Sequence, residues 1–261
     1  MPEPGRKDGR RRRALWLLGQ AAFVLFCIYL YFRIRNITEG SRDAAVAHAQ
    51  DVVDLERQLG IYVEGSLQEP FLSSNALSGI ANAVYIYGHW PVIVATMIWT
   101  AWRHRAVFLR LRDGMIVSGL LGMVVFVTWP LAPPRLADLG LVDTITEENT
   151  AYRVLQPTQF TNQFAAMPSL HAGWDLLVGI AIVTAASTAV VKAIGYAMPV
   201  LMTMSVVVTA NHYILDVVAG IALVLVGHAA ALALERRRRR VAASEEEPVE
   251  TTDSVNPVVG R

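Results

Sequence analysis

Long apolar runs, separated by short polar stretches, dominate the pattern of this chain. A membrane-crossing helix needs about 20 predominantly apolar residues. The pattern predicts six such spans, at residues 14–32, 76–102, 114–131, 169–188, 193–210 and 213–234. The second run is long and contains Pro91, so we expect a kink there, or a re-entrant piece followed by a span. The pattern therefore predicts an all-α, polytopic membrane protein built as a six-span helical bundle.

Residues 41–60 follow a different, amphipathic pattern in which apolar and polar positions share the segment. Such a segment is typical of a helix that lies along a membrane surface. We therefore expect a peripheral amphipathic helix beside the bundle. The expected organisation is a basic N-terminus at 1–13, a membrane domain at 14–240 and an acidic, disordered tail at 241–261.

Composition and charge agree with a membrane protein. Hydrophobic residues make up 54% of the 261 residues and charged residues only 17%, against about 25% charged in soluble domains. One cysteine, Cys27, excludes an intramolecular disulfide and a cysteine-based metal site. Six spans place 17 of the 23 Lys and Arg residues on one side, which predicts a multi-pass protein of the cell membrane with both termini cytoplasmic. The run Arg236–Arg240 is then a topology anchor contacting anionic lipid, and no nucleic-acid partner is expected.

Polar residues at membrane depth are costly and therefore mark candidate sites. The first group surrounds Ser169 and His171 at the outer start of the fourth span, directly after Pro168. A helix N-terminus favours an anion such as phosphate, and Asp175, four residues after His171, lies on the same helical face and can orient its imidazole. The alternative is a capping segment with an incidental histidine.

The second group is Asn211-His212-Tyr213-Ile214-Leu215-Asp216. His212 and Asp216 are four residues apart, and a carboxylate beside an imidazole fixes its tautomer and raises its basicity. The alternative is a hydrogen bond that only packs two helices together.

Two further groups are weaker. Arg135 leaves the third span after three prolines, and its guanidinium can clamp phosphate oxygens or, alternatively, extend to lipid headgroups. Asn82, Tyr85 and His89 share one face of the second span and either line a pocket or bond helices together.

The two histidine motifs together resemble those of the type 2 phosphatidic acid phosphatase superfamily. The matching residues are Pro168-Ser169-Leu170-His171 and, about forty residues later, His212-Tyr213-x-x-Asp216-x-x-Ala219-Gly220. The Ala132-Pro133-Pro134-Arg135 and Ala166-Met167-Pro168 segments are most similar to its inositol phosphorylceramide synthase-like branch. The resemblance covers residues 76–234, and loosely the segment 41–60.

This resemblance implies a six-span bundle with an extracytoplasmic site and a phosphohistidine mechanism that needs no metal and no cofactor. It implies that His212 is the nucleophile, Asp216 its orienting carboxylate, His171 the general acid and Ser169 a phosphate contact. Two features depart from the phosphatase pattern: Ser205 is followed by Val206 where an arginine is common, and the first motif, with lysine and Arg-Pro, is not found. Arg135 is the nearest substitute.

The sequence therefore predicts an integral membrane lipid phosphatase or phosphotransferase. Its partners would be a lipid phosphate or phospholipid, a polyol or inositol acceptor if the phosphoryl group is transferred, and membrane lipids. One alternative is a proton-coupled transporter that uses the buried His and Asp groups, although it leaves Arg135 unexplained and the chain shows no internal repeat. An inactive membrane scaffold is the other. Vanadium haloperoxidases share the motifs but do not need six membrane spans.

Overall fold

Helices form nearly all of the regular structure in the computed structural model, which describes residues 4–37, 40–145 and 162–246. Within these ranges the only β pairing is an isolated bridge between Leu131 and Ala165. The elements are α1 (Pro4–Ile37), α2 (Arg42–Gln58), α3 (Glu64–Leu72), α4 (Asn75–Tyr87), α5 (Trp90–Arg103), α6 (Arg105–Thr128), the 3₁₀ turn η1 (Pro134–Leu136), α9 (Leu170–Ala185), α10 (Ala189–Val208) and α11 (Ile214–Glu246).

Four helices in the described part of the chain are long and apolar enough to cross a membrane. They are α1, α6, α10 and α11, whereas α9 is apolar but has only 16 residues. The all-helical architecture is confirmed, and the count of six spans stays a prediction. Helix α11 continues through residues 241–246, residues 247–261 lie outside the described ranges, and the disordered tail stays a prediction.

The long second apolar run is divided into two helices, as the proline suggested. Helix α4 ends at Tyr87 with Gly88 as its C-cap, His89 has a non-helical backbone, and Pro91 occupies the first turn of α5. Proline is favoured in a first turn because that position needs no intrahelical N–H bond. With 14 residues, α5 is about 21 Å long at 1.5 Å per residue, shorter than a typical bilayer core.

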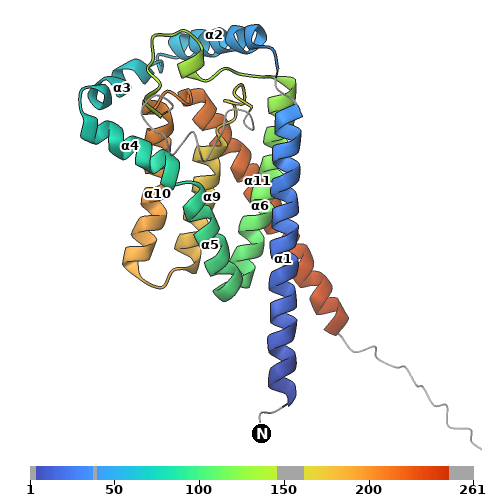
Figure 1. The fold of residues 1–261 in the computed structure, drawn as a ribbon. Helices are drawn as coiled ribbons and strands as arrows, with labels where there is room; N and C mark the ends of the chain where they lie inside the picture. The colour runs from blue at the N-terminus through green and yellow to red at the C-terminus, as the bar shows by residue number, and fades with distance from the viewer. Residues whose placement is uncertain (1–3, 38–39, 146–161, 247–261) are drawn as a thin grey trace, which may run out of the picture.

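The bundle has two different ends (Figure 1). Helices α5, α6, α9, α10 and α11 run along its length with α1 beside α6, while α2, α3 and α4 lie across one end. Helix α2 does form at the predicted amphipathic segment. Its stripe of Ala45, Ala49, Val52 and Val53 is buried against Leu131, Ala132, Ala166 and Tyr213 of the same chain. This stripe is therefore covered by protein, and a membrane-surface position of α2 stays a prediction.

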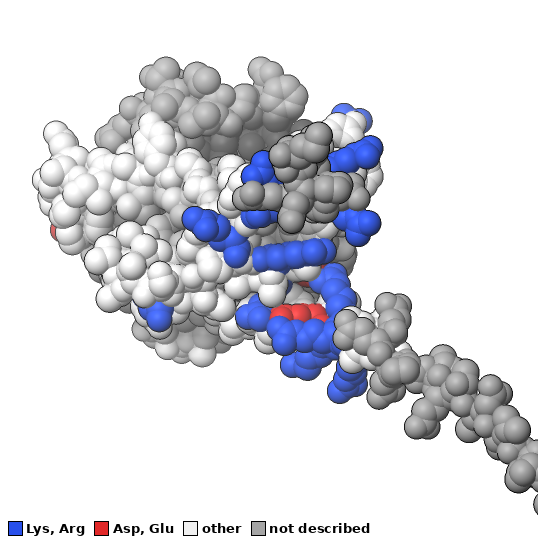
Figure 2. All heavy atoms as spheres, turned by 90° about the horizontal axis from the view of Figure 1, so that it is seen from below, with Lys and Arg blue, Asp and Glu red and all other residues white. Residues whose placement is uncertain are grey.

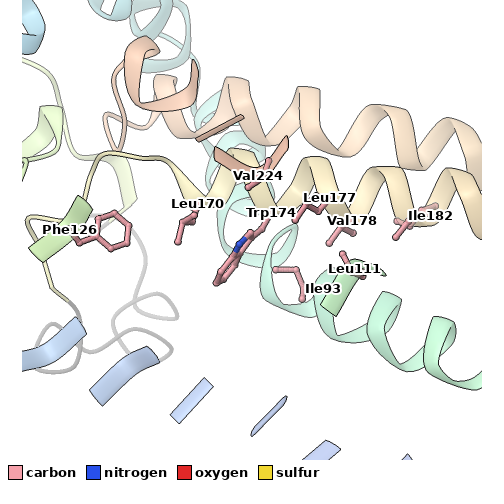
Figure 3. Close-up of a cluster of buried hydrophobic side chains, with 10 residues drawn as sticks. Ile93, Leu111, Phe126, Leu170, Trp174, Leu177, Val178, Ile182 and Val224 are labelled. Atoms are coloured by element: carbon pink, nitrogen blue, oxygen red, sulfur yellow. The ribbon is translucent and has the colours of Figure 1, made fainter. Parts of the chain in front are cut away.

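The core lies between α5, α6, α9 and α11 (Figure 3). Trp174 and Leu177 of α9 pack with Ile93, Leu111 and Val224, and the Trp174 indole Nε1 donates to Ser118 Oγ at 3.1 Å. Helices α9 and α11 approach closely because of two glycines. A Cβ at Gly173 would lie 2.8 Å from the Gly220 carbonyl oxygen, and a Cβ at Gly220 would overlap the Ser169 backbone. Small residues at these two positions bring the two histidine motifs together.

Basic side chains gather at the end of the bundle away from α2 and α3, which Figure 2 views directly. Two acidic residues are neutralised there. Asp113 pairs with Arg112 at 2.5 Å and Arg238 at 2.7 Å, and Glu235 pairs with Arg110 at 2.9 Å and Arg239 at 2.6 Å. The cationic end and the end that carries the histidine motifs are therefore opposite ends of one bundle.

Candidate active site

The turn between α10 and α11 places His212. Ala210 adopts a left-handed backbone with φ of 55°, which is uncommon for a residue other than glycine. The turn is held by the Val206 carbonyl, which accepts from the backbone N–H groups of both Asn211 and His212 at 3.0 Å. Strained backbone held by several bonds is frequent at functional sites. His212 is thereby fixed immediately before the first turn of α11.

Asp216 lies beside His212, as the spacing predicted. The His212 ring Nδ1 is 3.4 Å from Asp216 Oδ2, and the same oxygen accepts from the Tyr213 backbone N–H at 3.0 Å. His212 is 6% exposed and Asp216 is fully buried. With Nδ1 occupied by the carboxylate, the other ring nitrogen, Nε2, is the one available to a substrate.

Ser169 is bonded to the backbone where α9 and α11 meet. Its hydroxyl caps α9 by accepting from the Ala172 backbone N–H at 3.4 Å, and its own N–H donates to the Asp216 carbonyl at 2.9 Å. The side chain is fully buried. Ser169 thus joins the start of α9 to α11, which is the capping alternative, and a phosphate contact by Ser169 stays a prediction.

His171 lies in a row of rings next to His212. Its ring centroid is 5.9 Å from that of His212, 4.4 Å from that of His89 and 4.8 Å from that of Tyr85, on which it is stacked. His171 and His212 therefore come together, although 41 positions separate them in the sequence. His171 is partly exposed whereas His212 is buried, so His171 is the more accessible of the two.

The spacing predicted that Asp175 orients His171, but the histidine that Asp175 contacts is a different one. Asp175 Oδ1 is instead 2.8 Å from Nδ1 of His89, and both side chains are buried. The cause is the break between α4 and α5, which directs His89 toward α9. The site end therefore contains a second histidine–aspartate pair that spacing along one helix could not reveal.

Arg135 is brought next to His212 by its tie to Asn211. Its Nη1 donates to Asn211 Oδ1 at 2.9 Å, its backbone N–H donates to the Ala210 carbonyl at 3.0 Å, and its Nε pairs with Asp143 at 3.2 Å. The Arg135 side chain is 15% exposed, so it is neither a free surface arginine nor fully buried. Arg135 therefore lies beside the turn that carries His212, and its role as a phosphate clamp stays a prediction.

Asn82 supports this arrangement from a distance. Its amide donates to the Thr144 carbonyl at 2.9 Å and accepts from the Thr144 hydroxyl at 3.0 Å. These two hydrogen bonds hold the loop segment that carries Asp143, the partner of Arg135. Asn82 therefore joins helix to loop, while Tyr85 and His89, from the same predicted face, contact His171.

Two buried acids were missed by sequence reasoning. Glu56 of α2 and Glu64 of α3 are both fully buried, and they accept from the backbone N–H groups of Leu215 and Ile214 at the start of α11. Glu56 lies among the buried apolar positions of the amphipathic segment, which was a signal that could have singled it out. Burial and the neighbouring Glu64 carboxyl raise the pKa of Glu56 to about 8.

These features define a class: an all-helical protein with apolar helices of membrane-spanning length and a buried His–Asp pair facing a second histidine at one end. The family model of the PAP2 superfamily matches residues 50–230. The chain belongs to the PAP2 superfamily, and this membership suggests phosphatase or phosphotransferase activity on a lipid phosphate. No curated protein and no solved structure matched the chain.

Proposed function

We propose that the protein is a membrane enzyme that cleaves a phosphoester or phosphodiester bond of a lipid through a phosphohistidine on His212. The observation that carries this proposal is the placement of His171 beside His212, with Asp216 at the Nδ1 of His212. A nucleophile with an orienting carboxylate and a neighbouring acid is the set of groups that phosphoryl transfer through a covalent intermediate requires. Membership of the PAP2 superfamily supports the same chemistry.

In the first step, Nε2 of His212 attacks phosphorus and the bond from phosphorus to the leaving oxygen breaks. His171 gives its proton to that oxygen, and the lipid alcohol departs. Asp216 stabilises the positive charge that develops on His212, since its Oδ2 faces Nδ1 at 3.4 Å. In the second step, His171 takes a proton from water or an alcohol, the acceptor attacks phosphorus, and the phosphorus–nitrogen bond breaks. Neither step uses a metal ion, so chelators are expected to leave the rate unchanged.

Arg135 supplies the positive charge toward the phosphoryl oxygens. Its Nη1 and Nε bond to Asn211 and Asp143, which fixes the guanidinium plane, and we propose that its remaining hydrogens bind the phosphoryl oxygens. At the position where an arginine is common in the family, Val206 is fully buried beside Tyr85. A site with fewer cations favours the singly charged diester over the nearly dianionic monoester. This is the pattern we propose for head-group transfer of the inositol phosphorylceramide synthase-like kind.

The experiment offers purified protein a labelled lipid monoester and a labelled lipid diester, each with and without inositol. Free phosphate and new phosphodiester are followed together, with His212→Ala as the control. We expect turnover by the wild type, none by His212→Ala, and a higher relative rate on the diester. Absence of both products with every lipid would contradict the proposed function.

We also propose a six-span topology with the site end extracytoplasmic, because the basic end is expected to face the cytoplasm. Two exposed serines offer a matched pair for cysteine labelling in a Cys27→Ala background: Ser66 in α3 and Ser187 between α9 and α10. We expect an impermeant thiol reagent added outside intact cells to label Ser66→Cys only. Labelling of Ser187→Cys alone would reverse the orientation.

A further inference from the structure

The first turn of α11 is held by three carboxylates from three different elements. The backbone N–H of Tyr213 donates to Asp216 Oδ2 at 3.0 Å, that of Ile214 to Glu64 Oε1 at 3.1 Å, and that of Leu215 to Glu56 Oε1 at 2.8 Å. The opening N–H groups of a helix have no partner within the helix, and negative charge stabilises them. Helices α2 and α3 thus contact the backbone that directly follows His212.

The second oxygen of each glutamate is buried and receives no hydrogen bond from the described residues. Oε2 of Glu56 and Oε2 of Glu64 are buried and have no partner as carboxylates, yet the two side chains are within hydrogen-bonding reach of one another. Two ionised carboxylates at that separation repel, and a buried charge without a partner is costly. A single proton between them turns one oxygen into a donor and satisfies both.

We propose that Glu56 and Glu64 form a carboxylic acid–carboxylate pair that shares one proton and positions the His212–Asp216 dyad from behind. The inference rests on the proposed function for its catalytic consequence. The pair does not touch the substrate, since each glutamate contacts the backbone of α11 on the side of α2 and α3. Its role is to fix the start of α11 and therefore the distance between His212 and the phosphorus atom.

A bound metal cation between Glu56 and Glu64 is less well supported than a shared proton. No group of three or more His, Cys, Asp or Glu side chains in the described residues is arranged to hold a metal ion. The proton also agrees with the electrostatics, because the pKa of Glu56 is raised to about 8 by burial first and then by the hydrogen bond with Glu64. The titratable groups that interact with Glu56 are acidic or neutral, namely Glu64, Asp216, Tyr62 and Tyr213, while Arg57 of the same helix lies over the Tyr62 ring.

The pH dependence follows from the direction of this shift. Folding raises the pKa of Glu56 from 4.5 to about 8, so its contribution to stability is fully present below about pH 4.5 and is lost as the pH rises to 8. In the folded protein the shared proton leaves near pH 8, and the two carboxylates then repel. Positioning of His212 should weaken in the same pH range.

The test compares Glu56→Gln, Glu56→Ala and the exposed control Glu69→Gln on α3. Glutamine has the shape of a protonated glutamate and can donate to Glu64 while accepting from Leu215. We expect the ratio of kcat for Glu56→Gln over wild type to be level up to pH 7 and to rise above pH 8. The ratio cancels every pH effect that the two enzymes share. Glu56→Ala should lose at least about tenfold in kcat at pH 7 with KM little changed.

A second readout does not depend on activity. The difference in Tm between Glu56→Gln and wild type should grow from pH 5 to pH 8 and then level off, while Glu69→Gln matches wild type at every pH. A pH-independent loss of Tm in Glu56→Gln would overturn the shared proton in favour of a bound cation or two ionised carboxylates. If the enzyme is active but the kcat ratio of Glu56→Gln over wild type stays level at all pH values, the positioning role is overturned. If the wild type is inactive but the Tm values follow the expected pattern, the proposed function is overturned and the Glu56–Glu64 pair is retained.

Discussion

The two histidine–aspartate pairs at the site end of the bundle are built in different ways. Asp175 lies 2.8 Å from His89 and joins two separate elements, α9 and the break between α4 and α5. Asp216 lies 3.4 Å from His212 and also accepts from the Tyr213 backbone at 3.0 Å, so its charge is divided between a side chain and the start of α11. The shorter pair is the better one by geometry alone.

The difference shows that the strength of a pair does not identify the reactive one. His89 is 3% exposed and its neighbours are the rings of His171, Trp90 and Trp174. Next to His212, the side chain of Asn211 accepts a hydrogen bond from Arg135. The backbone N–H of His212 donates to the Val206 carbonyl. Within residues 4–37, 40–145 and 162–246, the looser pair is the one that combines an imidazole with a nearby cation, so we assign the reaction to His212 and a supporting role to His89.

The largest expected effect separates the two pairs directly. Asp216→Asn should lower kcat by about 10⁴-fold, because an amide cannot stabilise the positive charge that forms on His212. Asp175→Asn is the matched change in the other pair and should cost no more than about 10²-fold, through displacement of His89 and His171. Steady-state kinetics on one lipid substrate measures both variants. Equal losses, or a larger loss in Asp175→Asn, would reverse the assignment of the pairs.

The next effect concerns His171, whose ring lies between those of His89 and His212. His171→Ala should lower kcat on a lipid alkyl phosphate by about 10²–10⁴-fold, the usual contribution of a general acid. A nitrophenyl ester needs little protonation of its leaving group, so the variant should recover most of the release of nitrophenol. His212→Ala is the control and should not recover. Similar recovery by both variants would remove the distinction between acid and nucleophile.

The smallest expected effect tests the role of Arg135, the cation next to the His212 turn. Arg135→Lys retains the charge but loses the planar fork whose fixed N–H directions reach Asn211, Asp143 and a phosphoryl oxygen. We expect kcat/KM to fall by about tenfold, an energy close to that of one charge-assisted hydrogen bond. Turnover of matched monoester and diester lipids gives the value. Full activity on both lipids would make Arg135 an interfacial anchor and remove it from the site.

The sequence was informative wherever a local rule determined the structure. Apolar runs located the helices, Pro91 marked the division of the second run, and the spacing of four residues placed Asp216 beside His212. Glycine is needed at positions 173 and 220 because α9 and α11 approach each other too closely there for a Cβ atom. Family membership, from residues 50–230, agrees with the resemblance of the two histidine motifs.

Other features depend on contacts between distant segments and could not be predicted from spacing. Asp175 is spaced four residues from His171 but contacts His89, because the break between α4 and α5 directs the His89 side chain toward α9. Glu56 occurs on the buried face of an amphipathic helix, and only the fold shows that this face covers α11 instead of lipid. Asn82 is bonded to the Thr144 loop, which no motif indicates, whereas the cap made by Ser169 was the alternative that the sequence offered.

The central claim is that His212 carries the phosphoryl group during turnover. The most direct measurement is to mix wild type with a lipid substrate labelled at phosphorus, quench within one turnover, and locate the label by peptide mass spectrometry. The predicted result is a base-stable, acid-labile label on His212 that forms and decays at rates consistent with kcat and is absent in His212→Ala. A label on another residue, or turnover by wild type with no labelled protein at any time, would contradict the claim.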